Sequence, residues 1–271
     1  MKQLLTIIFI TLVVYACKMD SKSKIELESE TEVTAQKTTS ESNEWIYLFD
    51  GTSTKGWRAY NGDALPPGWI VKDSTLTFDT QLGLEQDYTG GKDIIYGLEE
   101  FDNFELYVEW KLPKGGNSGI FYHLKENIPN AGPPNISPEY QLIDDENYAD
   151  IHDLTEYNIS LGYTENPGEL KPLQQTASDY AMHAADPDKK ILHPFGEWNS
   201  SKIIFTPERV EHWLNGKMVL SFVPWSEEWY EKKNSDKWKT SEHYGTFKTG
   251  YIGFQDHSSP IWFRNIKIKK L

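Results

Sequence analysis

The chain has 271 residues, with 41 Asp and Glu against 27 Lys and Arg, and its formal net charge at pH 7 is −14. Such an acidic chain without a basic block binds the phosphate backbone of nucleic acids poorly, so we exclude nucleic acid as a partner. The single cysteine excludes an intramolecular disulfide and a cysteine-based zinc site.

Residues 1–16, MKQLLTIIFITLVVYA, have the pattern of an export signal. Lys2 gives the segment a positive start, and the apolar run at 4–14 is too short to span a bilayer comfortably. A small residue followed by Cys17 resembles the lipobox of bacterial lipoproteins, in which the cysteine becomes lipidated. The alternative is an ordinary secretory signal that contains a cysteine. Because Lys18 is not the aspartate of inner-membrane retention, we expect a lipid-anchored protein of the bacterial cell envelope, at the outer membrane.

The segment that follows, residues 17–44, is a predicted tether. It has no glycine, proline or aromatic residue and too few apolar side chains to offset the entropy cost of ordering, so we predict disorder. Residues 18–44 carry a net charge of −3, which leaves −12 on residues 45–271. The acidity therefore belongs to the predicted folded domain, where it suits a neutral glycan better than an anionic ligand.

Residues 45–271 read as one all-β domain, because short runs that alternate apolar and polar residues recur between turn signals. Asn215-Gly216 is a strong hairpin signal, and Ser226 is a candidate cap for the one convincing helix, at 226–238. We predict strands at 45–49, 69–71, 75–78, 104–112, 118–124, 139–143, 201–205, 210–214, 218–223, 251–255 and 261–269. Many short strands with one polar face predict a sandwich of two antiparallel sheets.

Two long segments, 125–138 and 144–197, lack a regular pattern and hold most of the prolines and several histidines. Long loops on a sandwich are usually functional or disordered. Their tyrosines, tryptophans and histidines favour ordered loops over one end of a sheet.

Seven short motifs, in order and with sensible spacing, resemble those of the 3-keto-disaccharide hydrolase family. They are LFDG with GW at 48–57, GGNSGIFY at 115–122, PEYQLIDD at 138–145, GEWN at 196–199, HWLNG at 212–216, GFQDH at 253–257 and WFRNI at 262–266. Each motif alone is weak, but together they cover residues 45–271; the segment 145–193 departs most from the family pattern. The resemblance implies a jelly-roll sandwich similar to concanavalin A-like lectins and glucanases, and exported lipoproteins of glycan-degrading bacteria.

The activity that this resemblance implies places modest demands on the protein. The chain lacks the Glu-x-Asp-x-x-Glu spacing with which laminarinase-like sandwiches supply two paired carboxylates. In a 3-keto sugar the C3 carbonyl acidifies the C2 proton, so a base can remove it, the enediolate can expel the C1 substituent, and water can then add. This route needs one base, an acid for the leaving group, and a positive or hydrogen-donating group at the enolate oxygens.

Strand alternation selects candidates for these roles. In the run 139–143, Tyr140 and Leu142 share an apolar face, which puts Glu139 and Gln141 on the opposite, ligand-facing side.

Two further motifs contribute polar side chains. Gln255 and His257 share one face of their run, and Asn117 follows two glycines. We predict that Glu139 and His257 form the acid–base pair and that Gln141, Gln255 and Asn117 contact sugar hydroxyls. The structural alternatives are a loop histidine bonded to backbone for His257 and a turn residue for Asn117.

Two sets of side chains offer ligands to a divalent metal, which would suit enediolate stabilisation. One set combines His152 with Glu139 and His257. The other is acidic and would suit calcium: Asp144, Asp145, Asp150 and Asp153. The alternative for both is a solvated loop without metal, and no other cofactor is expected.

Aromatic side chains near these motifs are candidates for contact with a sugar ring. Trp69 follows a glycine-containing loop, Tyr122 shares a face with Ser118 and Ile120, and Tyr180 lies in the long loop. Core packing is the alternative for Trp69.

Arg264 shares its parity with apolar neighbours, which predicts a buried ion pair, with Asp256 as its candidate partner.

Two functions therefore stand side by side: an enzyme that cleaves 3-keto-glycosides, and a non-catalytic carbohydrate-binding module that uses the same cleft. They differ in what Glu139 and His257 do. A conventional glucanase would instead release unoxidised sugar. In each case the expected partner is an oligosaccharide or glycoside, and the only expected membrane contact is the acyl anchor at Cys17.

Overall fold

The computed structural model of the chain describes residues 44–271. The predicted signal at 1–16, the lipidation site Cys17 and the tether up to residue 43 lie outside this part. None of the helices within 44–271 is long and apolar enough to cross a membrane.

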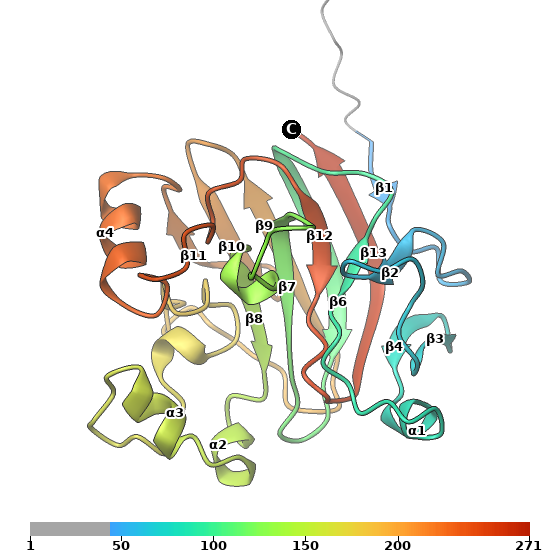
Figure 1. The fold of residues 1–271 in the computed structure, drawn as a ribbon, viewed down its shortest axis with the longest axis horizontal. Helices are drawn as coiled ribbons and strands as arrows, with labels where there is room; N and C mark the ends of the chain where they lie inside the picture. The colour runs from blue at the N-terminus through green and yellow to red at the C-terminus, as the bar shows by residue number, and fades with distance from the viewer. Residues whose placement is uncertain (1–43) are drawn as a thin grey trace, which may run out of the picture. The chain divides into compact units, whose positions relative to one another are not determined.

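The described residues form two antiparallel sheets packed face to face (Figure 1). The larger sheet has eight strands, in the spatial order β11 (Lys217–Phe222), β10 (Val210–Leu214), β9 (Asn199–Phe205), β6 (Phe104–Lys111), β13 (Ile261–Lys270), β4 (Thr75–Phe78) and β3 (Trp69–Lys72), with β1 (Ile46–Tyr47) paired to β13. The smaller sheet has five, in the order β2 (Trp57–Ala59), β5 (Ile94–Tyr96), β12 (Tyr251–Phe254), β7 (Asn117–Leu124) and β8 (Glu139–Ile143). The chain crosses repeatedly between the sheets, and the predicted all-β jelly-roll sandwich is confirmed.

Local sequence signals explain most of these elements. The Asn215-Gly216 turn joins β10 to β11, and both turn residues have positive φ, which asparagine and glycine tolerate well. Helix α4 (Glu227–Ser235) begins after Ser226, whose hydroxyl accepts a hydrogen bond from the Trp229 amide. Three short helices, together with β2 and β5, are too short to show a clear period. The helices are α1 (Thr80–Leu84), which follows β4, and α2 (Tyr148–Ile151) and α3 (Thr155–Ser160), which lie in the long segment 144–197.

These helices have a simple spatial arrangement. Helices α2, α3 and α4 lie along one side of the sandwich, beside the edge strands β8 and β11 (Figure 1). The predicted ordered loops over one end of a sheet are therefore found here, and they reach the edge of the smaller sheet.

The core lies between the sheets, and aromatic side chains join its two walls. Phe254 of β12 stacks on Phe263 of β13, with ring centroids 3.9 Å apart. Trp57 stacks on the other side of this pair, 4.8 Å from Phe254. Such dense aromatic packing supplies much of the apolar burial that stabilises a sandwich.

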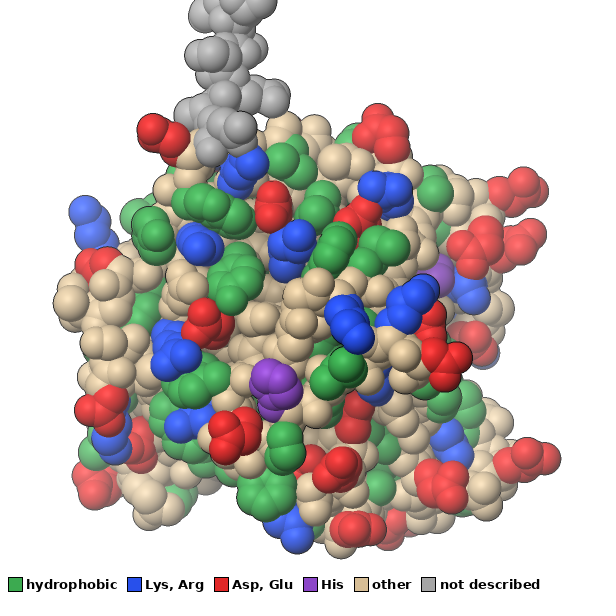
Figure 2. Space-filling view, turned by 180° about the vertical axis from the view of Figure 1, so that it is seen from behind, with side chains coloured by type: hydrophobic (Ala, Val, Ile, Leu, Met, Phe, Trp, Pro, Cys, Tyr) green, Lys and Arg blue, Asp and Glu red, His purple; other side chains and the backbone are tan. Residues whose placement is uncertain are grey.

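The outer face of the larger sheet is polar, as the alternation of β6 predicts. Glu105 pairs with Lys202, and Glu109 pairs with Arg264 at 2.7 Å. The prediction of a buried Arg264 paired with Asp256 is therefore wrong. Arg264 lies on the outer face with Trp262, and an irregularity in the pairing of β13 with β6 after Arg264 places Ile266 on the opposite, core face. Figure 2 shows the face turned away from the view of Figure 1, with basic and acidic side chains interspersed over it.

The stacked pair in the core leads to a stability prediction. Replacement of Phe263 by alanine removes the contact to Phe254 and leaves a cavity between the sheets, so we expect the free energy of unfolding to fall by roughly 3–5 kcal/mol. Urea denaturation measures it. Phe195→Ala is the control, because Phe195 is 47% exposed; equal losses in the two variants would contradict this view of the core.

Candidate active site

The site is built on the outer face of the smaller sheet, where β7 and β8 pair. Tyr140 and Leu142 point into the core, so Glu139 and Gln141 point outward, as predicted. In β7 the matching outward position is Gly119, which lies opposite Gln141. Because glycine has no side chain, the sheet face is open at this point.

Glu139 fills part of that opening. A β-carbon at residue 119 would overlap the Glu139 carboxyl, so this glycine makes room for it. The Glu139 side chain is only 3% exposed, yet its Oε1 has no hydrogen-bond partner among the described residues. A buried carboxyl in this state is costly unless a ligand or a proton satisfies it.

A cavity of about 320 Å³ lies over this face. Its floor contains four of the predicted site residues: Asn117, Glu139, Gln141 and Gln255. A second cavity, of about 800 Å³, shares Asn117, Tyr148 and His257 with the first. The two therefore adjoin, and His257 stands where they meet.

Three buried oxygen atoms around the inner cavity have no hydrogen-bond partner among residues 44–271: Asn117 Oδ1, Glu139 Oε1 and Gln255 Oε1. Each can accept a hydrogen bond. Buried polar atoms in native proteins are usually satisfied, so three unpaired acceptors at one cavity point to a ligand that brings several donors. Sugar hydroxyl groups are such donors.

The pKa values of the two predicted acid–base residues are shifted in opposite directions. Burial raises the pKa of Glu139 to about 8. The positive charge of Lys237 lowers this pKa, and the negative charges of Asp93 and Asp179 raise it. Burial lowers the pKa of His257, and the nearby His152 adds to this. At neutral pH the Glu139 carboxyl therefore holds its proton, while the His257 imidazole is neutral.

Two aspartates hold the segment that carries Gln255 and His257. Asp93 accepts a hydrogen bond from the Asp256 amide at 2.9 Å. The Asp256 carboxylate accepts hydrogen bonds from Tyr88 at 2.6 Å and from the Trp69 indole at 3.4 Å. Asp256 is thus a structural carboxylate, as expected, but its partners are aromatic side chains instead of Arg264.

The roof of the inner cavity comes from the long segment 144–197 and from the residues that follow α4. Tyr157 of α3 and Tyr180 share a hydrogen bond of 2.6 Å between their hydroxyl groups, and Lys237 donates to Tyr157 at 2.8 Å. All three line the cavity, which fits the predicted role of Tyr180. Tyr157 and Lys237 were not predicted, because no local pattern separates them from the other tyrosines and lysines of these segments.

A model of the family described as 3-keto-alpha-glucoside-1,2-lyase-like matches residues 44–269. The chain belongs to this family. A 3-keto-disaccharide hydrolase of Bacteroides thetaiotaomicron is 36% identical over 245 residues, which cover 84% of this chain and 78% of the relative. These matches confirm the predicted family and the prediction of an enzyme that acts on glycosidic bonds.

Two solved structures from Parabacteroides distasonis, each described as a candidate glycosyl hydrolase, have related folds. The first has a TM-score of 0.70 at 35% identity and covers 84% of this chain and 94% of its own. The second has a TM-score of 0.58 at 26% identity and covers 84% of this chain and all of its own. The family fold therefore extends over the whole described sandwich.

Two aromatic residues predicted to contact sugar lie elsewhere in this family member. Trp69 is 4% exposed and stacks on Phe78 in the core. Tyr122 is fully buried between the sheets, where its hydroxyl lies 3.4 Å from His212 Nε2. The face of β7 that Tyr122 shares with Ile120 is the core face. The predicted sugar contacts of Trp69 and Tyr122 are therefore both wrong.

The predicted metal ligands do not come together. Within residues 44–271 no group of three or more His, Cys, Asp or Glu side chains has an arrangement that could hold a metal ion. Asp144 instead accepts hydrogen bonds from the Gly115 amide and the Asn147 side chain. His152 lines the outer cavity and bonds to the Gly115 carbonyl at 3.1 Å.

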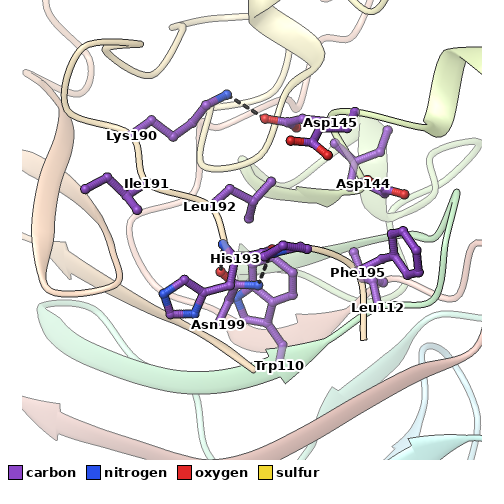
Figure 3. A pocket seen from close by; sticks show the side chains of 13 residues that line it. Trp110, Leu112, Asp144, Asp145, Lys190, Ile191, Leu192, His193, Phe195 and Asn199 are labelled. Carbon is purple, nitrogen blue, oxygen red and sulfur yellow. Dashed lines mark hydrogen bonds and ion pairs between the residues drawn. The ribbon is translucent and has the colours of Figure 1, made fainter. Parts of the chain in front are cut away.

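A separate cavity of about 390 Å³ lies between residues 144–146 and the loop at 190–195 (Figure 3). Its lysine is already engaged: Lys190 pairs with Asp145 at 2.6 Å and also donates to Gln175. None of the predicted acid–base or hydroxyl-binding residues lines it, so we do not place the active site there.

The raised pKa of Glu139 predicts a pH-dependent cost to stability. The folded state keeps the proton up to about pH 8, whereas the unfolded chain releases it near pH 4.5, so ionisation destabilises the folded state as the pH rises between these values. Glutamine does not titrate. We expect the free energy of unfolding of Glu139→Gln, relative to wild type, to increase by about 3 kcal/mol from pH 5 to pH 8.

Urea denaturation at several pH values measures this difference. Glu126→Gln is the matched control: the hydrogen bonds from Arg58 lower the pKa of Glu126, so it is ionised in both states over this range. Its difference from wild type is expected to stay constant with pH. A Glu139→Gln difference that is also constant would rule out the protonated, buried carboxyl.

Proposed function

We propose that this protein cleaves 3-keto-glycosides, including 3-keto-disaccharides, by C2 proton abstraction, elimination and hydration. One observation carries the proposal: the buried, unpaired Glu139 carboxyl at a cavity that also holds Asn117, Gln255 and His257. The curated relative from Bacteroides thetaiotaomicron, which acts on 3-keto-disaccharides by its name, supports this substrate class.

The opposite pKa shifts suggest which residue is the base and which the acid. The neutral His257 imidazole takes the C2 proton, and the C2–H electron pair becomes the C2–C3 double bond of an enediolate. When the C3 carbonyl re-forms, the C1–O bond breaks, and the protonated Glu139 gives its proton to the departing oxygen. The product is a 2-hydroxy-3-keto-glycal with a C1–C2 double bond.

Water then completes the net hydrolysis. Its hydroxyl adds to C1, and a proton returns to C2 from the imidazolium of His257, while the ionised Glu139 takes the remaining proton from the water. Both residues are thus back in their starting states. Asn117, Gln141 and Gln255 would hold the sugar hydroxyls during both halves.

The size of the site fits a substrate of two sugar units. The inner cavity of about 320 Å³ and the adjoining outer cavity of about 800 Å³ meet at His257. The scissile bond would lie at this junction, with one unit in each cavity.

The assignment predicts a bell-shaped pH profile. The ratio kcat/KM should rise through the lowered pKa of His257, below 6.5, and fall above the pKa of Glu139, about 8. The assay uses 4-nitrophenyl 3-keto-β-glucoside and a 3-keto-disaccharide, with and without chelator. The matching unoxidised glucosides are the controls, and their turnover at a similar rate would indicate a conventional glycosidase.

Variants separate the two roles. His257→Ala should lower kcat by 100-fold or more on both substrates, because both need the base. Glu139→Gln should remove the alkaline limb and reduce cleavage of the disaccharide far more than of the nitrophenyl glycoside, whose leaving group needs little acid help. Full activity in both variants would contradict these two roles. Absence of turnover of any 3-keto substrate by the wild type, with saturable binding of oligosaccharide, would instead support the lectin-like alternative.

We also propose that the protein is anchored in the cell envelope through an acyl group at Cys17. The support is the sequence alone: the short apolar run at 4–14 and the lipobox-like end of the signal. Metabolic labelling with palmitate in a bacterial host should label the wild type and not Cys17→Ala. Export of Cys17→Ala is a separate readout, and it persists if the signal is cleaved as an ordinary secretory signal. Equal labelling of both would contradict the anchor.

A further inference from the structure

Lys237 is a cation at the inner cavity. It follows α4 in the chain and lines the same cavity as Glu139. Its ammonium group lowers the pKa of Glu139, which places its positive charge within electrostatic reach of the proposed acid. A lysine in such a position is usually paired with a carboxylate.

Here the recorded partners are aromatic. Among residues 44–271, Nζ donates to the Tyr157 hydroxyl at 2.8 Å and lies 4.2 Å from the ring centroid of Tyr180 and 4.5 Å from that of Trp238. Cation–π contacts of this kind hold an ammonium group in place without neutralising its charge. The aromatic cage formed by Tyr157, Tyr180 and Trp238 therefore leaves the positive charge of Lys237 available to a ligand in the cavity.

The roof that carries the cage is itself fixed. The Trp238 ring stacks on Tyr244 with centroids 4.2 Å apart, and its indole N–H donates to the Tyr180 carbonyl at 3.3 Å. Trp238 and Tyr244 are both nearly fully buried. The ammonium thus stands on a rigid support, which electrostatic stabilisation of a short-lived anion requires.

The proposed reaction develops negative charge on the C3 oxygen, whereas the roles of His257 and Glu139 lie at C2 and at the leaving group. Loss of the C2 proton moves an electron pair into the C2–C3 bond and another onto the C3 oxygen. We propose that Lys237 is the group that stabilises this enediolate oxygen, through its charge and an Nζ–H hydrogen bond. Lys237 gains and loses no proton in the step. The C3 oxygen becomes a neutral carbonyl oxygen again when the C1–O bond breaks, and the negative charge ends on the Glu139 carboxylate, which has given its proton to the departing oxygen.

This inference rests on the proposed function, so its test has two arms. In the first, Lys237→Met keeps the length of the side chain and removes the charge. With the 3-keto-disaccharide, kcat should fall by roughly 100-fold with little change in KM, and exchange of the C2 proton with solvent deuterium should slow in parallel. Lys239→Met is the matched control, because Lys239 is exposed and does not line the cavity.

The second arm does not need turnover. Ascorbate is a stable, sugar-derived enediolate anion at neutral pH, and calorimetry measures its binding to the whole protein. We expect binding by wild type and Lys239→Met, and at least tenfold weaker binding by Lys237→Met.

The two arms separate two kinds of failure. If wild type cleaves 3-keto substrates and Lys237→Met retains kcat, proton exchange and ascorbate affinity, the role of Lys237 is wrong and the proposed function stands. A rise in KM alone would likewise overturn it, in favour of a roof that only binds. If the wild type cleaves no 3-keto substrate but binds ascorbate, and Lys237→Met binds ascorbate more weakly, the proposed reaction fails and the anion site stands.

Discussion

The site depends on one constraint, the burial of an unpaired carboxyl on the face of a sheet. The Glu139 carboxyl can approach β7 so closely only because residue 119 has no side chain, and Glu139 then lines the cavity. This arrangement opposes folding, since a buried carboxyl without a partner must keep its proton or lose solvation. The dense aromatic core around Phe254 and Phe263 offsets that cost.

The fold divides the site between a rigid floor and a roof made of insertions. Strands β12, β7 and β8 are neighbours in the smaller sheet, which brings together residues near 117, 139 and 255 although they are distant in the chain. Hydrogen-bonded strands hold such side chains in register. The roof residues Tyr157, Tyr180 and Lys237 come from segments beside the edge strands, where the sandwich architecture places no demand on length.

The same physics shows what could be predicted from sequence. Alternation within a strand assigns residues to two faces, and the apolar pair Tyr140 and Leu142 identified the inner one, so Glu139 and Gln141 were placed correctly. In β7 each face carries an aromatic side chain, Phe121 on one and Tyr122 on the other, so alternation could not tell which face meets the core. Tyr122 was therefore assigned to the cleft although it is fully buried.

Other misses have a different origin, because they depend on contacts between distant segments. Trp69 is buried because Phe78 and Phe263 cover it from other strands. Lys237 belongs to the site only because α3 and the loop at 176–183 fold beside it. Asp144 and Asp145 interact with Gly115 and Lys190, which are distant in the chain. The physical distinction between a binding module and an enzyme also rests on such a contact. Sugar hydroxyls can be bound by amides alone, which need no titratable group. A carboxyl held neutral near pH 7, at the same cavity as a neutral imidazole and an ammonium group, fits the reaction that we propose, in which a proton moves and an anion forms.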